Sequence, residues 1–303
     1  IVQNYINSFK LDLDYHQSFG QHHILASAGV ELNQGTVQNN WNINYGVLYD
    51  LGYHSYYIPD AIQRLYEKGK DYYTIRNKVN NNIGMLTRAS YSFANRYSVD
   101  ALLRFDASNR FGPSRYVRWL PTWNVELTWG VDREHFFRHL RPLSSLRLKT
   151  YVGMVADNPS VTNSLEEIYP SIPWRPSSKE IGLAFTHLAN HDLTYEKTLT
   201  YGARLGFGLF KGRISAEIDA YRRRSYDLVG PIYTQSVGGV AQKSGNVAEL
   251  QSSGLQFTLS AVNLKLKDFS WTTGFSYLHK TNKITSLLSN PTVRTMISGS
   301  GFS

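Results

Sequence analysis

The stretch that decides the fold is residues 119–129, which reads Trp119-Leu120-Pro121-Thr122-Trp123-Asn124-Val125-Glu126-Leu127-Thr128-Trp129. Most of its odd positions carry large apolar side chains. Its even positions carry polar side chains from Thr122 on, whereas Leu120 at the start is apolar. Because successive side chains of a β-strand point to opposite faces, this alternation predicts a strand with one apolar and one polar face.

The same period of two recurs along most of the chain. It predicts an all-β protein built from about ten long antiparallel strands, and no segment predicts a long amphipathic helix. The segments that alternate most clearly are 5–19, 24–32, 85–93, 97–105, 119–129, 146–152, 199–207, 214–220, 255–261 and 269–277.

The connections between these strands alternate between short and long, so every long connection should leave the same end of the sheet. A bacterial outer-membrane barrel has this layout, with tight turns on one side and long loops on the other. We expect the short connections near 20–21, 94–96, 132–144, 210–213 and 263–267, and the long ones at 35–83, 107–118, 156–192, 229–245 and from 284 on.

The spacing of two tryptophans supports a membrane-spanning sheet. Trp119 and Trp129 share the apolar face ten residues apart. At about 3.3 Å per residue and a tilt of about 40°, they differ in height by about 25 Å, which is the height of the apolar band between the aromatic girdles of such barrels. The alternative is a soluble β-sandwich in which these tryptophans lie in the core.

Composition excludes several classes of protein. The 303 residues contain no cysteine, which removes disulfides, thiolate metal sites and cysteine nucleophiles. Aromatic residues reach 14%, too many for a disordered chain. The net charge of +9 comes from 32 basic and 23 acidic residues that are scattered, so nucleic-acid binding is not expected. No apolar run approaches the roughly 18 residues of a transmembrane helix, and the first residues do not form a signal peptide.

Several ordered motifs resemble those of SusC/RagA-type TonB-dependent outer-membrane transporters. The stretches Leu193–Thr198, Gly206–Ile214 and Asp219–Leu228 are similar to the patterns L-x-W-E-K-T, F-G-F-F-x-x-R-L and D-Y-Y-x-R-x-T-x-D-L. Arg104–Gly112 is similar to R-x-D-G-S-S-R-F-G. The resemblance covers residues 5–34 and 84–284; Tyr195 stands where the family usually has Trp.

The resemblance implies a larger protein than this chain. Such transporters have a barrel of about twenty-two strands with a plug inside it, and they act with TonB and with a SusD-like lipoprotein lid. We therefore expect residues 1–303 to be part of one β-barrel domain, with the plug domain and the C-terminal strands absent from this chain. An open sheet of ten strands would leave two unpaired edges, which lipid cannot satisfy.

No catalytic constellation, metal site or cofactor site is expected. Glu217 and Asp219 lie two residues apart on one predicted strand, where charges facing a lumen explain them better than acid–base catalysis. His16, His22 and His23 cluster at a turn without a neighbouring carboxylate at metal-binding spacing. The chain therefore does not read as an enzyme.

The long loops carry the candidate binding residues. Residues 41–73 hold many tyrosines among Asn, Asp and Gln, a mixture that suits sugar rings or peptides but also suits packing within the loop. The candidates for substrate or lid contact are Trp41, Tyr45, Tyr49 and Trp174. The candidates for lumen or plug contact are Arg104, Asp106 and Arg110.

These observations predict TonB-dependent import of oligosaccharides or peptides across an outer membrane, with the long loops extracellular. TonB would act through the plug, and the other expected partners are the lid, the substrate and outer-membrane lipid. Two alternatives stay open: a passive porin-type channel and a soluble carbohydrate-binding β-sandwich.

Overall fold

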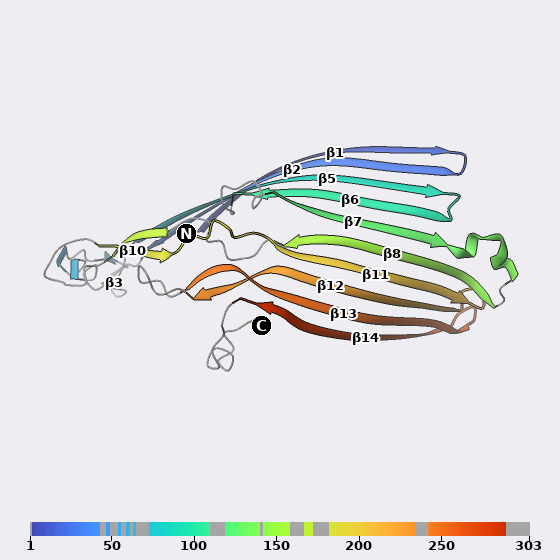
Figure 1. Cartoon of the computed structure of the whole chain (residues 1–303). Coiled ribbons are helices and arrows are strands. Elements are labelled where there is room, and N and C mark those ends of the chain that lie inside the picture. Colours follow the sequence, from blue (N-terminus) through green and yellow to red (C-terminus); the bar gives the residue numbers. More distant parts are fainter. Residues whose placement is uncertain are drawn as a thin grey trace.

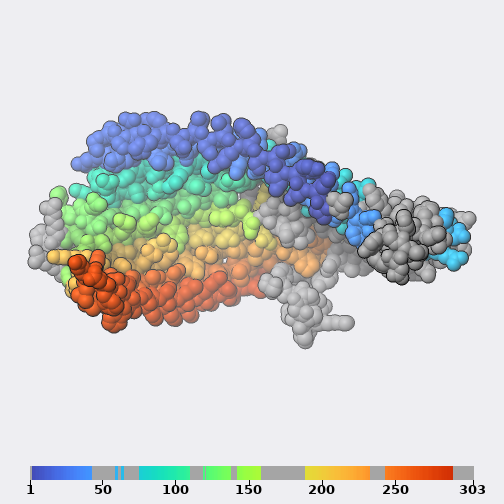
Figure 2. All heavy atoms as spheres, turned by 180° about the vertical axis from the view of Figure 1, so that it is seen from behind, coloured from blue at the N-terminus to red at the C-terminus, as the bar shows by residue number. Residues whose placement is uncertain are grey.

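A computed structural model describes residues 2–42, 47–48, 54–55, 59–60, 63–64, 73–109, 119–139, 142–157, 167–171, 182–233 and 242–288. Ten strands form one antiparallel sheet in the order β1-β2-β5-β6-β7-β8-β11-β12-β13-β14. Neighbours in the chain are therefore neighbours in the sheet, as the colour sequence across Figure 2 shows. The β-sandwich alternative is wrong, because the ten strands lie in one sheet and do not divide into two packed layers.

The ten strands of the main sheet are 12 to 24 residues long. Their bounds are β1 Val2–Phe19, β2 His22–Asn42, β5 Tyr73–Phe93, β6 Tyr97–Ser108, β7 Trp119–Gly130, β8 Leu143–Asp157, β11 Glu196–Leu209, β12 Ile214–Tyr233, β13 Gln242–Lys265 and β14 Ser270–Leu287. Two small hairpins pair β3 (Val47–Leu48) with β4 (His54–Ser55) and β9 (Glu167–Ser171) with β10 (Gly182–His187).

The short connections lie together at one end of the sheet, as expected (Figure 1). The connection between β7 and β8 is the most structured of them, with two 3-10 helices, η2 (Val131–Arg133) and η3 (His135–His139). Three of the tight turns use residues with positive φ, and two of these place a glycine there: Gly20 after β1 and Gly212 before β12. Glycine suits both positions because it lacks the Cβ that strains this backbone region.

The predicted boundaries of three long loops are wrong, because strands continue into them. The β2–β5 ladder runs to the pair Asn42 and Tyr73, so both ends of the predicted loop 35–83 are strand. The β12–β13 ladder runs to Tyr233 and Gln242 inside the predicted loop 229–245. The predicted loop 156–192 contains β9 and β10. Residues 35–42 carry amide side chains on both faces, so they pair without the alternation that identifies a strand from sequence.

One face of the sheet is apolar and open. Leu103 on β6 and Val152 on β8 lie in the interior of the sheet, yet their side chains are 39% and 37% exposed. Phe9 on β1 and Phe275 on β14 belong to the same face and are 58% and 54% exposed. A contiguous exposed apolar surface of this extent marks a contact with lipid or with another protein. The described residues include no helix that is long and apolar enough to cross a membrane.

The buried residues concentrate where β11 and β13 begin, at the end that carries the long connections. Leu193 is fully buried, and Tyr195 and Val247 are nearly so. Asn246 ties the two segments together: its side-chain oxygen accepts from the Thr194 N–H (2.9 Å), and its Nδ2 donates to the Thr194 carbonyl (3.0 Å). The coil before β11 is thus fixed against β13.

At the sides of the sheet, β1 and β14 each have only one neighbour. All eighteen residues of β1 are exposed, and so are all but the last of β14. The backbone groups along the outer side of both strands therefore have no partner within the described sheet.

Candidate functional site

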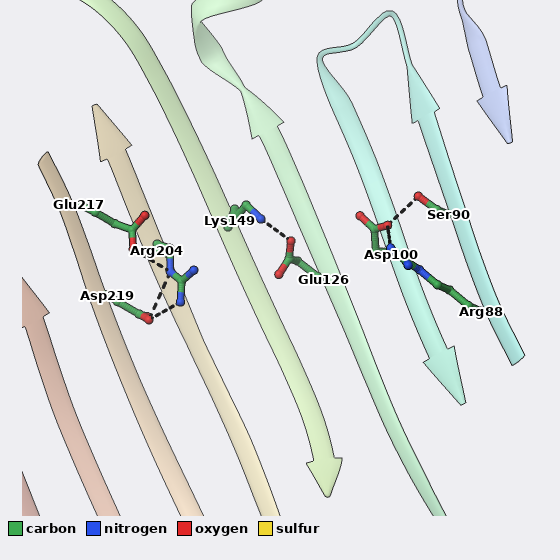
Figure 3. Close-up of polar contacts among 8 residues, drawn as sticks. All are labelled: Arg88, Ser90, Asp100, Glu126, Lys149, Arg204, Glu217 and Asp219. Atoms are coloured by element: carbon green, nitrogen blue, oxygen red, sulfur yellow. Dashed lines mark hydrogen bonds and ion pairs between the residues drawn. The ribbon is translucent and has the colours of Figure 1, made fainter. Parts of the chain in front are cut away.

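The second face of the sheet is polar and carries a row of charge pairs. Figure 3 shows side chains from β5, β6, β7, β8, β11 and β12 meeting their neighbours across the strands. Nζ of Lys149 lies 2.6 Å from Oε1 of Glu126. Asp100 accepts from Ser90 Oγ at 2.6 Å and lies 3.9 Å from the Arg88 guanidinium. The polar residues predicted from alternation therefore share one surface.

Arg204 on β11 stands between the two carboxylates of β12. Its Nη2 lies 2.8 Å from Asp219 Oδ2, and its Nε lies 3.4 Å from Glu217 Oε1. Tyr151 on β8 donates from its hydroxyl to Asp219 Oδ1 at 2.9 Å. Among the residues that the structure describes, Asp219 is the one charged residue that is buried, which its two strong partners explain. Glu217 and Asp219 are thus held by a guanidinium, and they do not face each other as an acid–base pair.

Glycines on this face accept aromatic side chains from the neighbouring strand. The ring of Tyr221 on β12 fills the place where Gly254 of β13 would carry a Cβ, and Tyr151 does the same at Gly202 of β11. A tyrosine laid over a glycine of the next strand shields the backbone there and fixes the register. Alternation alone predicts the polar face but not these pairs, which depend on the register.

A shallow hollow of about 550 Å³ lies on the polar face towards the short-turn end. Arg147, Lys149 and Arg204 line it together with Glu217 and several hydroxyl side chains, among them Ser215. Lys149 and Arg204 are engaged by carboxylates, so the wall presents polar groups of both signs. Its surface suits contact with a polar solute or with a polar protein segment.

The structure brings together Arg104 and Asp106, two of the candidates for lumen or plug contact. Arg104 Nε lies 2.8 Å from Asp106 Oδ2, and Arg104 Nη2 lies 3.2 Å from Glu31 Oε2 on β2. Sequence reasoning missed Glu31, which is 73 residues away from Arg104. The sequence does place Glu31 among the polar positions of the alternation in β2. That Arg104 is its ion-pair partner, however, depends on the pairing of β2, β5 and β6.

The other candidates are not part of this cluster. Trp41 lies near the end of β2, opposite Thr74, and its side chain is 50% exposed. Ten residues separate it from Glu31, or about 33 Å along the strand. The remaining candidates, Tyr45, Tyr49, Arg110 and Trp174, lie outside the described residues.

A second polar cluster closes the short-turn end. Glu134, between η2 and η3, accepts from the Tyr97 hydroxyl at 2.6 Å and from Trp129 Nε1 at 3.2 Å, and it lies 3.4 Å from Arg96 Nη1. Because the hydrogen bonds from Tyr97 and then Trp129 favour the carboxylate, they lower the pKa of Glu134. The carboxylate thereby holds two aromatic residues of the apolar face at its edge.

The buried coil before β11 also reaches the polar face. Burial, and secondarily the charge of Asp106, raises the pKa of the Tyr195 hydroxyl to about 12. The Tyr195 hydroxyl is therefore neutral at physiological pH. Sequence reasoning treated Tyr195 only as a departure from a family motif.

The histidines near the first turn have ordinary partners. His22 Nδ1 lies 2.7 Å from the Tyr91 hydroxyl, and His23 Nδ1 lies 2.9 Å from Ser18 Oγ. Within the part of the chain that the structure describes, no group of three His, Cys, Asp or Glu side chains is arranged to hold a metal ion.

A single long sheet with one polar face, one open apolar face and all its short turns at one end matches a known family. The model of the TonB dependent receptor-like β-barrel matches residues 2–298. The chain belongs to this family. Its members are outer-membrane receptors. In barrels of this kind the outward face is apolar and the inward face is polar.

Relatives of this receptor barrel include the TonB-dependent receptor SusC of Bacteroides thetaiotaomicron, 28% identical over 226 residues that cover 71% of this chain and 22% of SusC. The TonB-dependent receptor P3 of Formosa agariphila is 23% identical over 91% of this chain and 27% of that receptor. The chain therefore spans about a quarter of the length of these relatives.

Solved structures show the same fold. The structure of the RagAB peptide transporter superposes with a TM-score of 0.77 and 20% identity, over 95% of this chain and 31% of that chain. The outer-membrane transporter YddB of Escherichia coli superposes with a TM-score of 0.55 and 13% identity, over 93% of this chain and 34% of that one.

Proposed function

We propose that this receptor barrel belongs to a transporter that imports oligosaccharides or peptides across the outer membrane with energy supplied through TonB. The observation that carries the proposal is the two-faced sheet: exposed apolar side chains on one side and engaged charges on the other. Membership of the receptor family supports the use of TonB. The name of the RagAB peptide transporter supports peptides as one of the two substrate classes.

In the whole transporter, further strands would pair with β1 and β14 and close the barrel. The unpaired outer sides of both strands support this, because a lipid environment leaves no water to satisfy them. The chain would then be part of one barrel domain, and a separate plug would fill the interior. The long connections would face the cell exterior.

The cluster of Arg104, Asp106 and Glu31 would contact the plug. It holds one guanidinium and two carboxylates, so it carries a net charge of −1 and favours a Lys or Arg on the plug. Arg110, which lies outside the described residues, is proposed as a further plug contact. A photoreactive residue at position 106 of the full-length protein should crosslink to the plug, whereas one at Val125 on the apolar face should not. Equal crosslinking at both positions would refute this contact.

The aromatic residues of the long connections would contact a SusD-like lid or the substrate. Trp41 supports this role because it is exposed at the far end of a strand that extends well beyond Glu31. Tyr45, Tyr49 and Trp174 complete the proposed aromatic set.

The experiment that tests import is uptake of labelled oligosaccharides and peptides by cells that carry the full-length transporter, before and after the proton-motive force is dissipated. Energised import predicts accumulation that collapses on dissipation. If the labelled substrate instead keeps entering down its concentration gradient at an unchanged initial rate, the protein is a passive porin-type channel. No feature of the described sheet specifically supports that alternative.

The lid is tested by replacing residues 43–72 with a short Gly-Ser linker, which keeps the pairing of Asn42 with Tyr73. A second variant, Trp41→Ala, tests that residue alone. Lid association or uptake should be lost in the first variant and weakened in the second while the barrel still assembles. If the first variant keeps both activities, these aromatic residues only pack within the loop.

A further inference from the structure

Basic side chains gather on one part of the otherwise apolar outer face. The register places Arg222 and Arg224 of β12, Lys197 of β11 and Lys283 of β14 on that face. These four residues are called the cationic patch below. In the described residues of β1, β2, β5, β6, β7 and β8, the same face carries no Lys or Arg. Basic residues on a lipid-facing surface are costly unless something compensates them.

The patch spans four adjacent strands. Arg224 pairs with Gln251 of β13, and Gln251 pairs with Lys283. Arg224 and Lys283 are thus two strands apart, or about 10 Å, and Arg222 lies about 7 Å from Arg224 along β12. On β13, which lies between β12 and β14, the hydrogen-bonding residues Ser253 and Gln251 are opposite Arg222 and Arg224. The spacing suits an anionic group with several oxygen atoms that is held between two or three cations.

The patch lies at the edge of the apolar band that is nearer to the long connections, not within the band. On β12 the apolar residues Ile214, Ala216, Ile218 and Ala220 precede Arg222 on this face. Ten residues separate Ile214 from Arg224, which at about 3.3 Å per residue and a tilt of about 40° is a height of about 25 Å. Since the full apolar band has about that height, Arg222 and Arg224 reach the headgroup level at the end that carries the long connections.

The carboxylates near the patch do not balance it. Arg224 Nη2 lies 2.9 Å from Glu249 Oε2, and Lys197 Nζ lies 2.6 Å from Asp227 Oδ2. Among the described residues, no carboxylate lies within ion-pair distance of Arg222 or Lys283. The cationic patch therefore keeps a net charge of +2. The cations of the polar-face cluster around Arg204, by contrast, are engaged by carboxylates.

We propose that the cationic patch binds the phosphate groups of a phosphorylated glycolipid in the outer leaflet, the lipid A part of lipopolysaccharide. This inference rests on the proposed orientation, in which the long connections face the cell exterior. The acyl chains of such a lipid would lie on the apolar rows of β11 to β14, and its phosphates would reach Arg222 and Lys283. Tyr201, opposite Arg222 and 45% exposed, would contact the sugar rings.

The test uses the full-length transporter purified in detergent and titrated with lipid A in native mass spectrometry. The probes are lipid A with two phosphates, the same lipid after dephosphorylation, and phosphatidylglycerol. The variant R222Q/R224Q/K283Q removes three charges from the patch. The matched control removes three charges from exposed residues at the short-turn end of the same strands, R213Q/K265Q/K267Q.

Phosphorylated lipid A should bind the wild type more tightly than the other two probes. The patch variant should bind it roughly 10- to 100-fold more weakly, since each basic residue near a charged lipid surface contributes a severalfold effect, and the control should change less than about threefold. Heat-modifiable migration in gels verifies that both variants fold.

Unchanged binding by the patch variant, or an equal loss in the control, would overturn the proposal. Equal binding of phosphatidylglycerol would overturn the assignment to the glycolipid. Uptake is measured separately in the same variants. Lipid A binding that does not depend on the patch charges, together with normal energised uptake, would therefore refute the patch and leave the transport function standing. Uptake that ignores the proton-motive force would refute transport alone.

Discussion

Replacing Val125 with Arg tests which face of the sheet contacts lipid. Val125 lies on the apolar face of β7, opposite Ala101 on one side and Val152 on the other. Four residues separate it from Trp129 and six from Trp119. At about 3.3 Å per residue and a tilt of about 40°, it lies about 10 Å and about 15 Å in height from the two tryptophans. It is therefore close to the middle of the apolar band.

An arginine at the bilayer midplane on the lipid face of a barrel costs about 2–4 kcal/mol, because its charge loses most of its hydration. Val152 and Ala101 offer no charge to compensate it. The matched control is Ser98→Arg, on the polar face of β6 between the uncharged residues Ser92 and Thr128. In the aqueous interior that arginine stays hydrated, so we expect a change of less than about 1 kcal/mol.

The measurement is guanidinium-induced unfolding of the full-length receptor in lipid vesicles, with the two variants and the wild type compared at equal lipid composition. A cost of about 3 kcal/mol is roughly a hundredfold change in the ratio of folded to unfolded protein. If Ser98→Arg is the costly variant and Val125→Arg is tolerated, the faces are reversed. If both are tolerated, the sheet does not span a bilayer.

Three further outcomes follow from the same geometry. Single cysteines at Val125 and Glu126 should differ in labelling by a water-soluble thiol reagent, with only the second labelled, and equal labelling would contradict the two-faced sheet. The variant Asp219→Asn should destabilise the barrel by about 1–3 kcal/mol, because it weakens two hydrogen-bonded partners at a buried site, whereas Glu217→Gln, at a half-exposed pair, should cost less than about 0.5 kcal/mol in the same unfolding assay. The lowered pKa of Glu134 means that its stabilising effect is complete above the ordinary carboxyl pKa and is lost as the pH falls through the lowered value. Glu134→Gln should therefore lower stability at neutral pH and leave it unchanged in strong acid, and a deficit that persists in acid would refute this role.

The alternation of residues 119–129 and its repeats elsewhere in the chain were enough to predict an all-β sheet with two different faces. Successive side chains of a strand point to opposite faces, so the face of each side chain follows from its position in the chain. The same signal fails where both faces are polar. Residues 35–42 were therefore predicted as part of a loop, although they pair with β1 and β5. Strand ends are decided there by backbone pairing with a neighbour, which local composition does not reveal.

The contacts across strands depend on tertiary structure. Glu31 reaches Arg104 across 73 residues of sequence, and Tyr151 reaches Asp219 across 68, because the register of the intervening strands aligns them. Arg222 and Lys283 likewise share one patch only through their pairing with β13. By itself the sequence determined which face each side chain takes, because that choice is local. Only the register, a property of strands far apart in the chain, decided which side chains meet.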